Sequence, residues 1–90
     1  MRLRNKQPYS TEKHYLKCYG LTLNDVKNLM TQQNNCCALC DSSLDRFVVD
    51  HDHSTGQVRG LLCYPCNTGL GFFKESPDQL NKAILYLRRI

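Results

Sequence analysis

The fold is decided by the stretch Val48-Val49-Asp50-His51-Asp52-His53-Ser54-Thr55-Gly56-Gln57-Val58-Arg59-Gly60-Leu61-Leu62-Cys63-Tyr64-Pro65-Cys66-Asn67. Its beginning, preceded by Arg46 and Phe47, is apolar and β-branched and predicts a short strand up to His51. Residues 54–57 are turn-forming, and residues 58–62 predict a returning strand. A short helix is expected to begin near Tyr64. The stretch therefore predicts a β-hairpin followed by a helix, which is an α+β arrangement.

Four cysteines flank this hairpin in two pairs with the spacing of metal ligands. The pairs are Cys37-x2-Cys40 and Cys63-x2-Cys66, with 22 residues between them. Each pair offers two thiolates from one tight turn, and two pairs complete the tetrahedral site that zinc prefers. Four protein ligands leave no open position, so this zinc is expected to be structural. A Cys2His2 site using His51 and His53 fails, because those histidines are separated by one residue and the second cysteine pair would be unused.

Two further cysteines lie outside this pattern. Cys36 would give an x3 spacing if it replaced Cys37, so we treat it as a spare thiol. Cys18 lies alone on a predicted helix, and we expect it to be buried or half-buried.

The chain around the motif is short and weakly basic. It has 90 residues and a formal net charge of +4. A chain of this size buries too little apolar surface to be stable by that means alone, so a bound zinc would supply the missing stability. No apolar run approaches the length that spans a membrane, and the N-terminus does not resemble a secretory signal. The cysteines are therefore expected in a reducing cytosol, where metal binding is more frequent than disulfides.

Basic residues are concentrated at the N-terminus. Residues 1–19 contain one acid, Glu12, against five bases, which are Arg2, Arg4, Lys6, Lys13 and Lys17. We expect residues 1–19 to form a basic arm with a short helix over residues 11–18, and residues 20–90 to form the remainder of a single domain. The arm is either a solvated terminus or a contact for nucleic-acid phosphates, whose affinity would fall steeply with salt.

Two helices are expected to flank the hairpin. Thr22 caps the first, which extends to Gln33 and carries an apolar stripe at helical spacing. Ser76 opens the second as part of a capping box, with Pro77 at its first position. We expect the apolar faces of both helices to pack against the small core.

The run Asp50-His51-Asp52-His53 is hard to explain as core, although it would be unremarkable as a solvated turn. An oxygen of Asp50 and the amide oxygen of Asn67 suit a hard cation such as Mg²⁺. A neutral His51 beside that cation would act as a general base on an attacking water. Strict strand alternation puts Asp50 and His51 on opposite faces, so a shared site predicts that the strand ends or bulges there.

The run from Val49 to Gly71 resembles the recombination endonuclease VII family of phage nucleases, which belongs to the wider HNH, or ββα-metal, group. The resemblance includes residues 19–23, the Cys37-x2-Cys40 pair and the helix opened by Ser76-Pro77, and it covers about residues 13 to 87. It implies a small zinc-stabilised ββα-metal (HNH, or His-Me finger) domain with flanking helices. It also implies a DNA endonuclease that hydrolyses phosphodiester bonds with Mg²⁺, for which Mn²⁺ can substitute.

The resemblance also assigns roles to individual residues. It makes Asp50 and Asn67 the Mg²⁺ ligands and His51 the general base. His53 matches a family histidine of the site and is expected to contact phosphate or to support the base. Asp52 is interpreted as an orienting or structural residue. The zinc ligands that the resemblance implies are Cys37, Cys40, Cys63 and Cys66.

The expected partner is DNA, either branched or duplex, with no membrane partner. Resolution of a four-way junction requires two cuts and hence a homodimer, whereas a monomer would leave single nicks. The competing interpretation is a non-catalytic zinc module that binds nucleic acid, and a third is a purely structural zinc-stapled domain. The resemblance implies a phage or mobile-element origin and action in the cytoplasm of a bacterial host.

Overall fold

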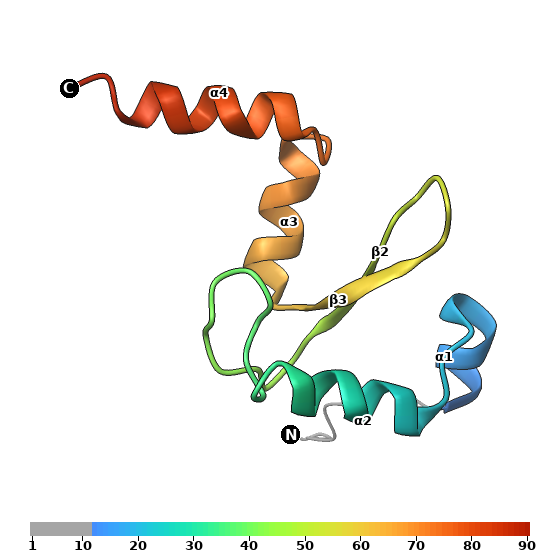
Figure 1. The fold of residues 1–90 in the computed structure, drawn as a ribbon. Helices are drawn as coiled ribbons and strands as arrows, with labels where there is room; N and C mark the ends of the chain where they lie inside the picture. Colours follow the sequence, from blue (N-terminus) through green and yellow to red (C-terminus); the bar gives the residue numbers. More distant parts are fainter. Residues whose placement is uncertain (1–11) are drawn as a thin grey trace.

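A two-stranded hairpin is followed by a helix in the computed structural model, which describes residues 12–90 (Figure 1). The predicted α+β arrangement is therefore confirmed. The elements of this part of the chain are α1 (Glu12–Tyr19), α2 (Leu23–Gln32), β2 (Val48–His51), β3 (Val58–Leu62), α3 (Tyr64–Phe72) and α4 (Pro77–Leu87).

Helix α2 begins where the sequence predicts, because Thr22 forms a complete capping box. The Thr22 hydroxyl accepts a hydrogen bond from the Asp25 backbone N–H at 3.0 Å, and the Asp25 carboxylate accepts one from the Thr22 N–H at 2.9 Å. These bonds satisfy backbone donors that a helix N-terminus leaves unpaired. The apolar stripe of α2 buries Val26 and Met30 in the core.

Strands β2 and β3 are antiparallel and contain an irregularity at Asp50. Val49 pairs with Leu61 and Asp50 with Gly60, but His51 pairs with Val58. Arg59 is therefore the extra residue of a β-bulge, which re-aims side chains around it. The strand irregularity that a shared site requires is present, and the extra residue lies on β3.

The hairpin turn is fixed by Asp52. Its carboxylate accepts hydrogen bonds from the backbone N–H groups of Ser54 at 2.7 Å and Thr55 at 3.2 Å. These two bonds hold the pKa of Asp52 below its usual value, because they favour the charged carboxylate. Gly56 completes the turn with a φ of +77°, a conformation that glycine adopts without strain. Asp52 therefore has the structural role that was one of its two expected roles.

The core lies between α1, α2 and the hairpin. Tyr15 of α1, Val26 of α2 and Leu61 of β3 are 3%, 0% and 0% exposed. Gln33 joins the end of α2 to β3, because its side-chain oxygen accepts from the Leu61 N–H and its nitrogen donates to the Leu61 carbonyl, both at 2.9 Å. These contacts fix the hairpin against the N-terminal helices.

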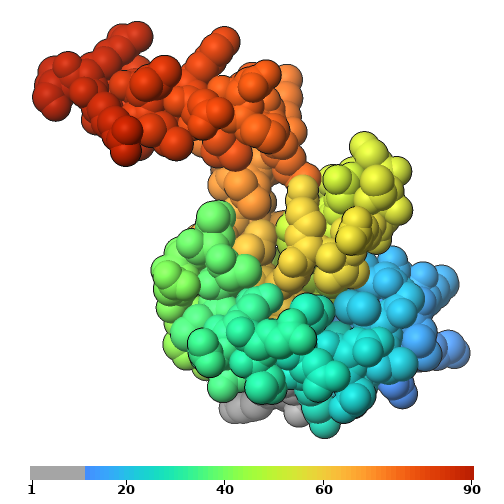
Figure 2. All heavy atoms as spheres, viewed as in Figure 1, coloured from blue at the N-terminus to red at the C-terminus, as the bar shows by residue number. Residues whose placement is uncertain are grey.

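Helix α4 does not pack against this core, contrary to the expectation from its apolar face. It projects from the rest of the molecule as a separate arm (Figures 1 and 2). Leu85 and Leu87 are 68% and 78% exposed. The physical reason is the turn after α3, where Lys74 and Glu75 have left-handed φ values of +56° and +54° and redirect the chain. Within residues 12–90, no helix has the length and apolar character needed to cross a membrane.

Candidate functional site

The four paired cysteines come together in one cluster. Their Sγ atoms all lie within 4.8 Å of one another, and the Sγ atoms of Cys40 and Cys63 are 3.8 Å apart. Tetrahedral zinc with Zn–S bonds of about 2.3 Å places its sulfur ligands about 3.8 Å from each other. The predicted ligand set therefore fits a zinc ion in both donor type and spacing.

Two tight turns present these thiols. Cys37 and Cys40 lie in the loop after α2, while Cys63 is the N-cap residue of α3 and Cys66 lies in its first turn. The Cys37 sulfur accepts hydrogen bonds from the backbone N–H groups of Leu39 and Cys63, both at 3.4 Å. The cluster thus joins the α2–β2 loop to the junction of β3 and α3.

The surroundings lower the pKa of two thiols of the cluster and raise the pKa of a third. Burial raises the pKa of Cys37, but backbone hydrogen bonds from Cys40, Cys63 and Leu39 outweigh burial and lower it to about 6. A hydrogen bond with the Ser42 hydroxyl lowers the pKa of Cys40. Burial, followed by hydrogen bonds with Cys63 and Cys40, raises the pKa of Cys66 to about 12. At pH 7 the metal-free cluster therefore holds a thiolate at Cys37 and a protonated thiol at Cys66.

We expect the affinity of this cluster for zinc to increase with pH. Zinc binds thiolates, so binding at pH 7 must release the proton of Cys66, and raising the pH favours that release. Below about pH 6 Cys37 also binds a proton, so the dependence on pH becomes steeper there. Competition with a chromogenic chelator from pH 5 to pH 8 measures the slope. An affinity that is constant over this range would contradict the ligand assignment.

The two remaining cysteines lie outside the cluster. Cys36 donates a hydrogen bond to the Asn34 carbonyl at 3.3 Å, in agreement with its interpretation as a spare thiol. Cys18 is exposed and its sulfur is 3.7 Å from Nδ1 of His14, so the expectation that it would be buried or half-buried is wrong. Tyr15 and not Cys18 occupies the buried face of α1.

Asp50 is a buried carboxylate that is neutralised by Arg59. The residue is 8% exposed, and its two oxygens accept hydrogen bonds from Arg59 Nε at 2.7 Å and Nη2 at 3.1 Å. A buried charge requires such a partner, and a two-bond guanidinium contact is a strong one. An ionised carboxylate has about four lone-pair sites, so this contact leaves Asp50 able to bind a cation as well.

His51 and His53 lie on one side of the hairpin, as strand alternation predicts. Their ring centroids are 4.8 Å apart, and the ring of His51 is 5.5 Å from that of Tyr19. Burial raises the pKa of Tyr19, so its hydroxyl stays protonated at neutral pH. His51 is half-buried between these rings, while the side chain of His53 is 73% exposed.

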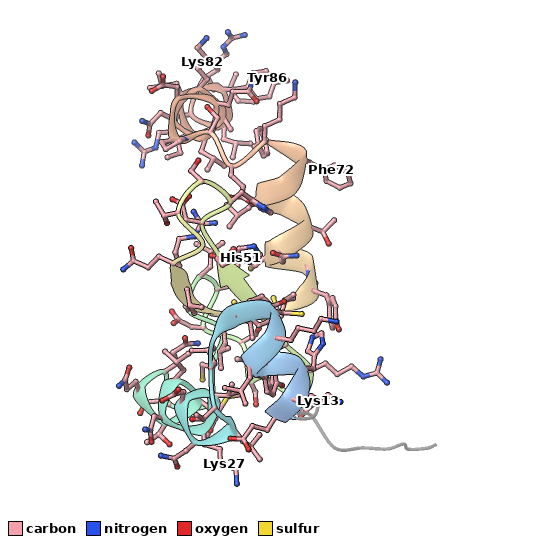
Figure 3. All side chains as sticks on the ribbon, turned by 90° about the vertical axis from the view of Figure 1, so that its right-hand side faces the viewer. Lys13, Lys27, His51, Phe72, Lys82 and Tyr86 are labelled. Carbon is pink, nitrogen blue, oxygen red and sulfur yellow. The ribbon has the colours of Figure 1, made fainter. Side chains whose placement is uncertain are left out.

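Asn67 lies in the first turn of α3, and α3 contacts β2. Figure 3 shows His51 beside α3 in the middle of the molecule. Among residues 12–90, no hydrogen bond joins the Asn67 side chain to Asp50, whose carboxylate is held by Arg59. The structure thus brings together the elements that carry Asp50, His51 and Asn67, without a hydrogen bond between the two expected Mg²⁺ ligands in the described part of the chain.

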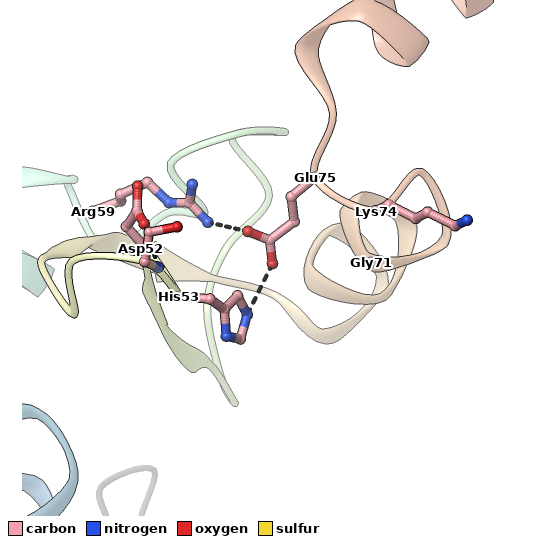
Figure 4. Close-up of a pocket in the computed structure, with 7 residues that line it drawn as sticks. Asp52, His53, Arg59, Gly71, Lys74 and Glu75 are labelled. Carbon is pink, nitrogen blue, oxygen red and sulfur yellow. Dashed lines mark hydrogen bonds and ion pairs between the residues drawn. The ribbon is translucent and has the colours of Figure 1, made fainter.

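Two charged residues of this region were not identified from the sequence. Arg59 Nη2 donates to Glu75 Oε1 at 2.8 Å, and His53 Nε2 forms an ion pair with Glu75 Oε2 at 3.2 Å (Figure 4). The three side chains line a hollow of about 500 Å³. The signal for Arg59 was its place as the lone arginine of the strand opposite Asp50. Glu75 gave no such signal, because it lies after α3 and is separated from Arg59 by 16 positions in the sequence.

The predicted phosphate contacts are only partly described. Lys13 and Lys17 are exposed on α1, one helical turn apart. Lys13 lies at the end of the molecule opposite Lys82 of α4 (Figure 3). The other three predicted contacts, Arg2, Arg4 and Lys6, lie outside the described residues.

Comparison with known proteins gives a consistent result. The protein-family model described as recombination endonuclease VII matches residues 12–89. The Gene 59 protein of Mycobacterium phage D29 is 39% identical over 84 residues, which covers 89% of this chain and 51% of the relative. The Gene 59 protein of Mycobacterium phage L5 is 38% identical over 82 residues, with coverage of 87% and 50%. The chain spans about half the length of these curated relatives, and no solved structure gives a significant match.

Proposed function

The chain belongs to the recombination endonuclease VII family, and from this premise we propose that it is a Mg²⁺-dependent DNA endonuclease of the HNH, or ββα-metal, type. The observation that carries the proposal is the hairpin and helix joined at the four-cysteine cluster, with Asp50 and His51 on β2 and Asn67 on the contacting helix α3. Membership of the family implies a nuclease, and these residues supply an oxygen donor set and a base for phosphodiester hydrolysis.

We assign the zinc a structural role. All four cysteines of the cluster are used as ligands, which leaves no open coordination position for substrate. The ion would hold β3 and α3 against the loop after α2, and so fix the relative positions of β2 and Asn67.

His51 is the proposed general base. Its half-buried position between the rings of Tyr19 and His53 restricts the imidazole while leaving part of it open to water. The neutral imidazole would take the proton from a water that attacks phosphorus, and His53 would support the base or contact a phosphate.

Asp50 and Asn67 are the proposed holders of Mg²⁺, or of Mn²⁺ in its place. The carboxylate and amide oxygens are the hard donors that this ion takes, with waters and a substrate phosphate completing its shell. When bound, Mg²⁺ supplies stabilisation of negative charge on the phosphate and on the departing oxygen. Asp50 is held in place for this task by Arg59, whose two hydrogen bonds fix both carboxylate oxygens.

The proposed substrate is DNA in a bacterial host, and the phage origin of the relatives supports this setting. Residues 1–19 are proposed to contact DNA phosphates and residues 20–90 to carry the nuclease centre. Tyr15 is buried in the core, so α1 holds Lys13 and Lys17 at a fixed place on the domain. These lysines would position the backbone without reading its sequence.

The test uses zinc-loaded protein, a labelled four-way junction and a linear duplex made from its arms. Omission of Mg²⁺ is the control, because a chelator would also remove zinc. We expect strand cleavage only with Mg²⁺. Paired cuts near the branch point would indicate a dimeric resolvase, and single nicks in the duplex would indicate a monomer. DNA binding without cleavage under any of these conditions would replace the proposal by a non-catalytic zinc module.

A further inference from the structure

Arg59 is held along one edge of its guanidinium and open along the other. Nε and Nη2 donate to Asp50, and Nη2 also donates to Glu75 at 2.8 Å and approaches the His51 carbonyl at 3.4 Å. Among residues 12–90, Nη1 has no hydrogen-bond partner. The side chain is 43% exposed, and it lines the same hollow as His53. An arginine fixed in this way keeps two N–H groups free for an external acceptor.

Glu75 joins two of the basic side chains that line the hollow, Arg59 and His53. One carboxylate oxygen accepts from Arg59 Nη2, and the other is 3.2 Å from His53 Nε2 (Figure 4). Glu75 reaches them because the turn after α3 is left-handed at both Lys74 and Glu75. Neither is glycine, and paired left-handed residues of this kind are costly and occur where the surroundings require them. The turn is closed by a hydrogen bond from the Glu75 N–H to the Leu70 carbonyl at 2.8 Å.

We propose that Arg59 binds a phosphate of the DNA substrate through Nη1, and that Glu75 is the positioning residue that holds Arg59 and His53 toward that phosphate. This inference rests on the proposed nuclease function and adds two residues to it. Arginine suits the task, because its planar donors match phosphate oxygens and its charge is permanent. Hydrogen bonds to Asp50 and Glu75 raise the pKa of Arg59 further above its ordinary value.

Glu75 is needed because Asp50 is a shared partner. A cation bound to Asp50 would share the carboxylate with Arg59 and so weaken the Arg59 contact without displacing it. Glu75 is a second acceptor for the same Nη2 atom, so it keeps Arg59 in the hollow. It also neutralises part of the positive charge of Arg59.

The test compares zinc-loaded wild type with Arg59→Lys, Glu75→Gln, the double variant and Asp78→Asn. Asp78 is the matched control, because it is an exposed acid three residues from Glu75 and lies outside the hollow. The measurements are kcat and KM with Mg²⁺, the DNA dissociation constant without Mg²⁺, and thermal unfolding. We expect kcat to fall by about 10 to 100-fold in Arg59→Lys and in Glu75→Gln, as for misplaced catalytic groups, without loss of folding.

The double variant tests whether Glu75 acts through Arg59 or independently of it. If Glu75 acts through Arg59, the double variant will be no slower than Arg59→Lys, whereas independent effects multiply. A wild-type kcat in either single variant, or multiplied losses in the double variant, would overturn the inference. If wild type cuts no DNA, or His51→Ala remains fully active, the proposed function itself fails. The Mg²⁺-free dissociation constants then decide, since Arg59→Lys should bind DNA more weakly than Asp78→Asn.

Discussion

Cys66→Ser is expected to remove the cooperative thermal unfolding transition of this domain, even with zinc in excess. Cys66 is one of four sulfur atoms within 4.8 Å of each other, and serine does not supply the thiolate that completes the set. Zinc contributes about 10–16 kcal/mol to the folding of small zinc modules, whereas whole domains are stable by only about 5–15 kcal/mol. Because the zinc contribution is as large as the whole stability of a small domain, a cluster weakened by one ligand is expected to leave too little free energy for cooperative unfolding.

Apart from the ion pairs of Glu75 and the partly buried Leu70, the described fold has little else to hold α3 against the hairpin. The sheet has two short strands, and an isolated hairpin is marginally stable in water. Helix α3 contains no buried residue, so it owes its position to Cys63 and Cys66 more than to apolar packing. We thus expect α3 and the hairpin to separate when the cluster is broken.

Cys36→Ser is the matched control, since Cys36 is adjacent to the ligand Cys37 but lies outside the cluster. A serine hydroxyl can donate to the Asn34 carbonyl as the thiol does. Circular dichroism during heating measures folding, and the absorption of bound Co²⁺ reports the sulfur ligands. A transition in Cys66→Ser at the wild-type temperature would contradict the structural role of the cluster.

The parts of the fold that depend on local pattern were predictable from the sequence. The hairpin, the Thr22 capping box and the cysteine cluster each follow from residues close together or from a fixed ligand spacing. Even an irregularity of the hairpin near Asp50 could be inferred, because strict alternation conflicts with one shared site.

The Asp50–Arg59–Glu75 chain was not predictable, because it depends on backbone geometry that has no local signal. Asp50 meets Arg59 through a bulge whose extra residue could have lain on either strand. Glu75 returns to the hairpin through a left-handed turn built without glycine. The exposure of α4 has the same origin, since its amphipathic pattern indicates an apolar face but not what covers it.

His51→Ala is expected to lower kcat for DNA cleavage by about 10² to 10⁴-fold, which is the range for loss of a general base. KM should change little, because the charge of Arg59 and the proposed phosphate contacts of Arg59 and His53 would remain. The substitution removes ring contacts with Tyr19 and His53 from a half-buried position, so the unfolding temperature should stay close to that of wild type.

His53→Ala distinguishes the base from its neighbour. The side chain of His53 is 73% exposed and paired with Glu75. We therefore expect it to support the general base and not to act as the base itself. Its loss should reduce kcat less than the loss of His51, and added imidazole should restore activity to His51→Ala in preference to His53→Ala. Both variants must be purified in parallel with wild type, so that a contaminating nuclease would appear equally in all three. A larger loss of kcat in His53→Ala than in His51→Ala would contradict the assignment of His51 and would make His53 the general base.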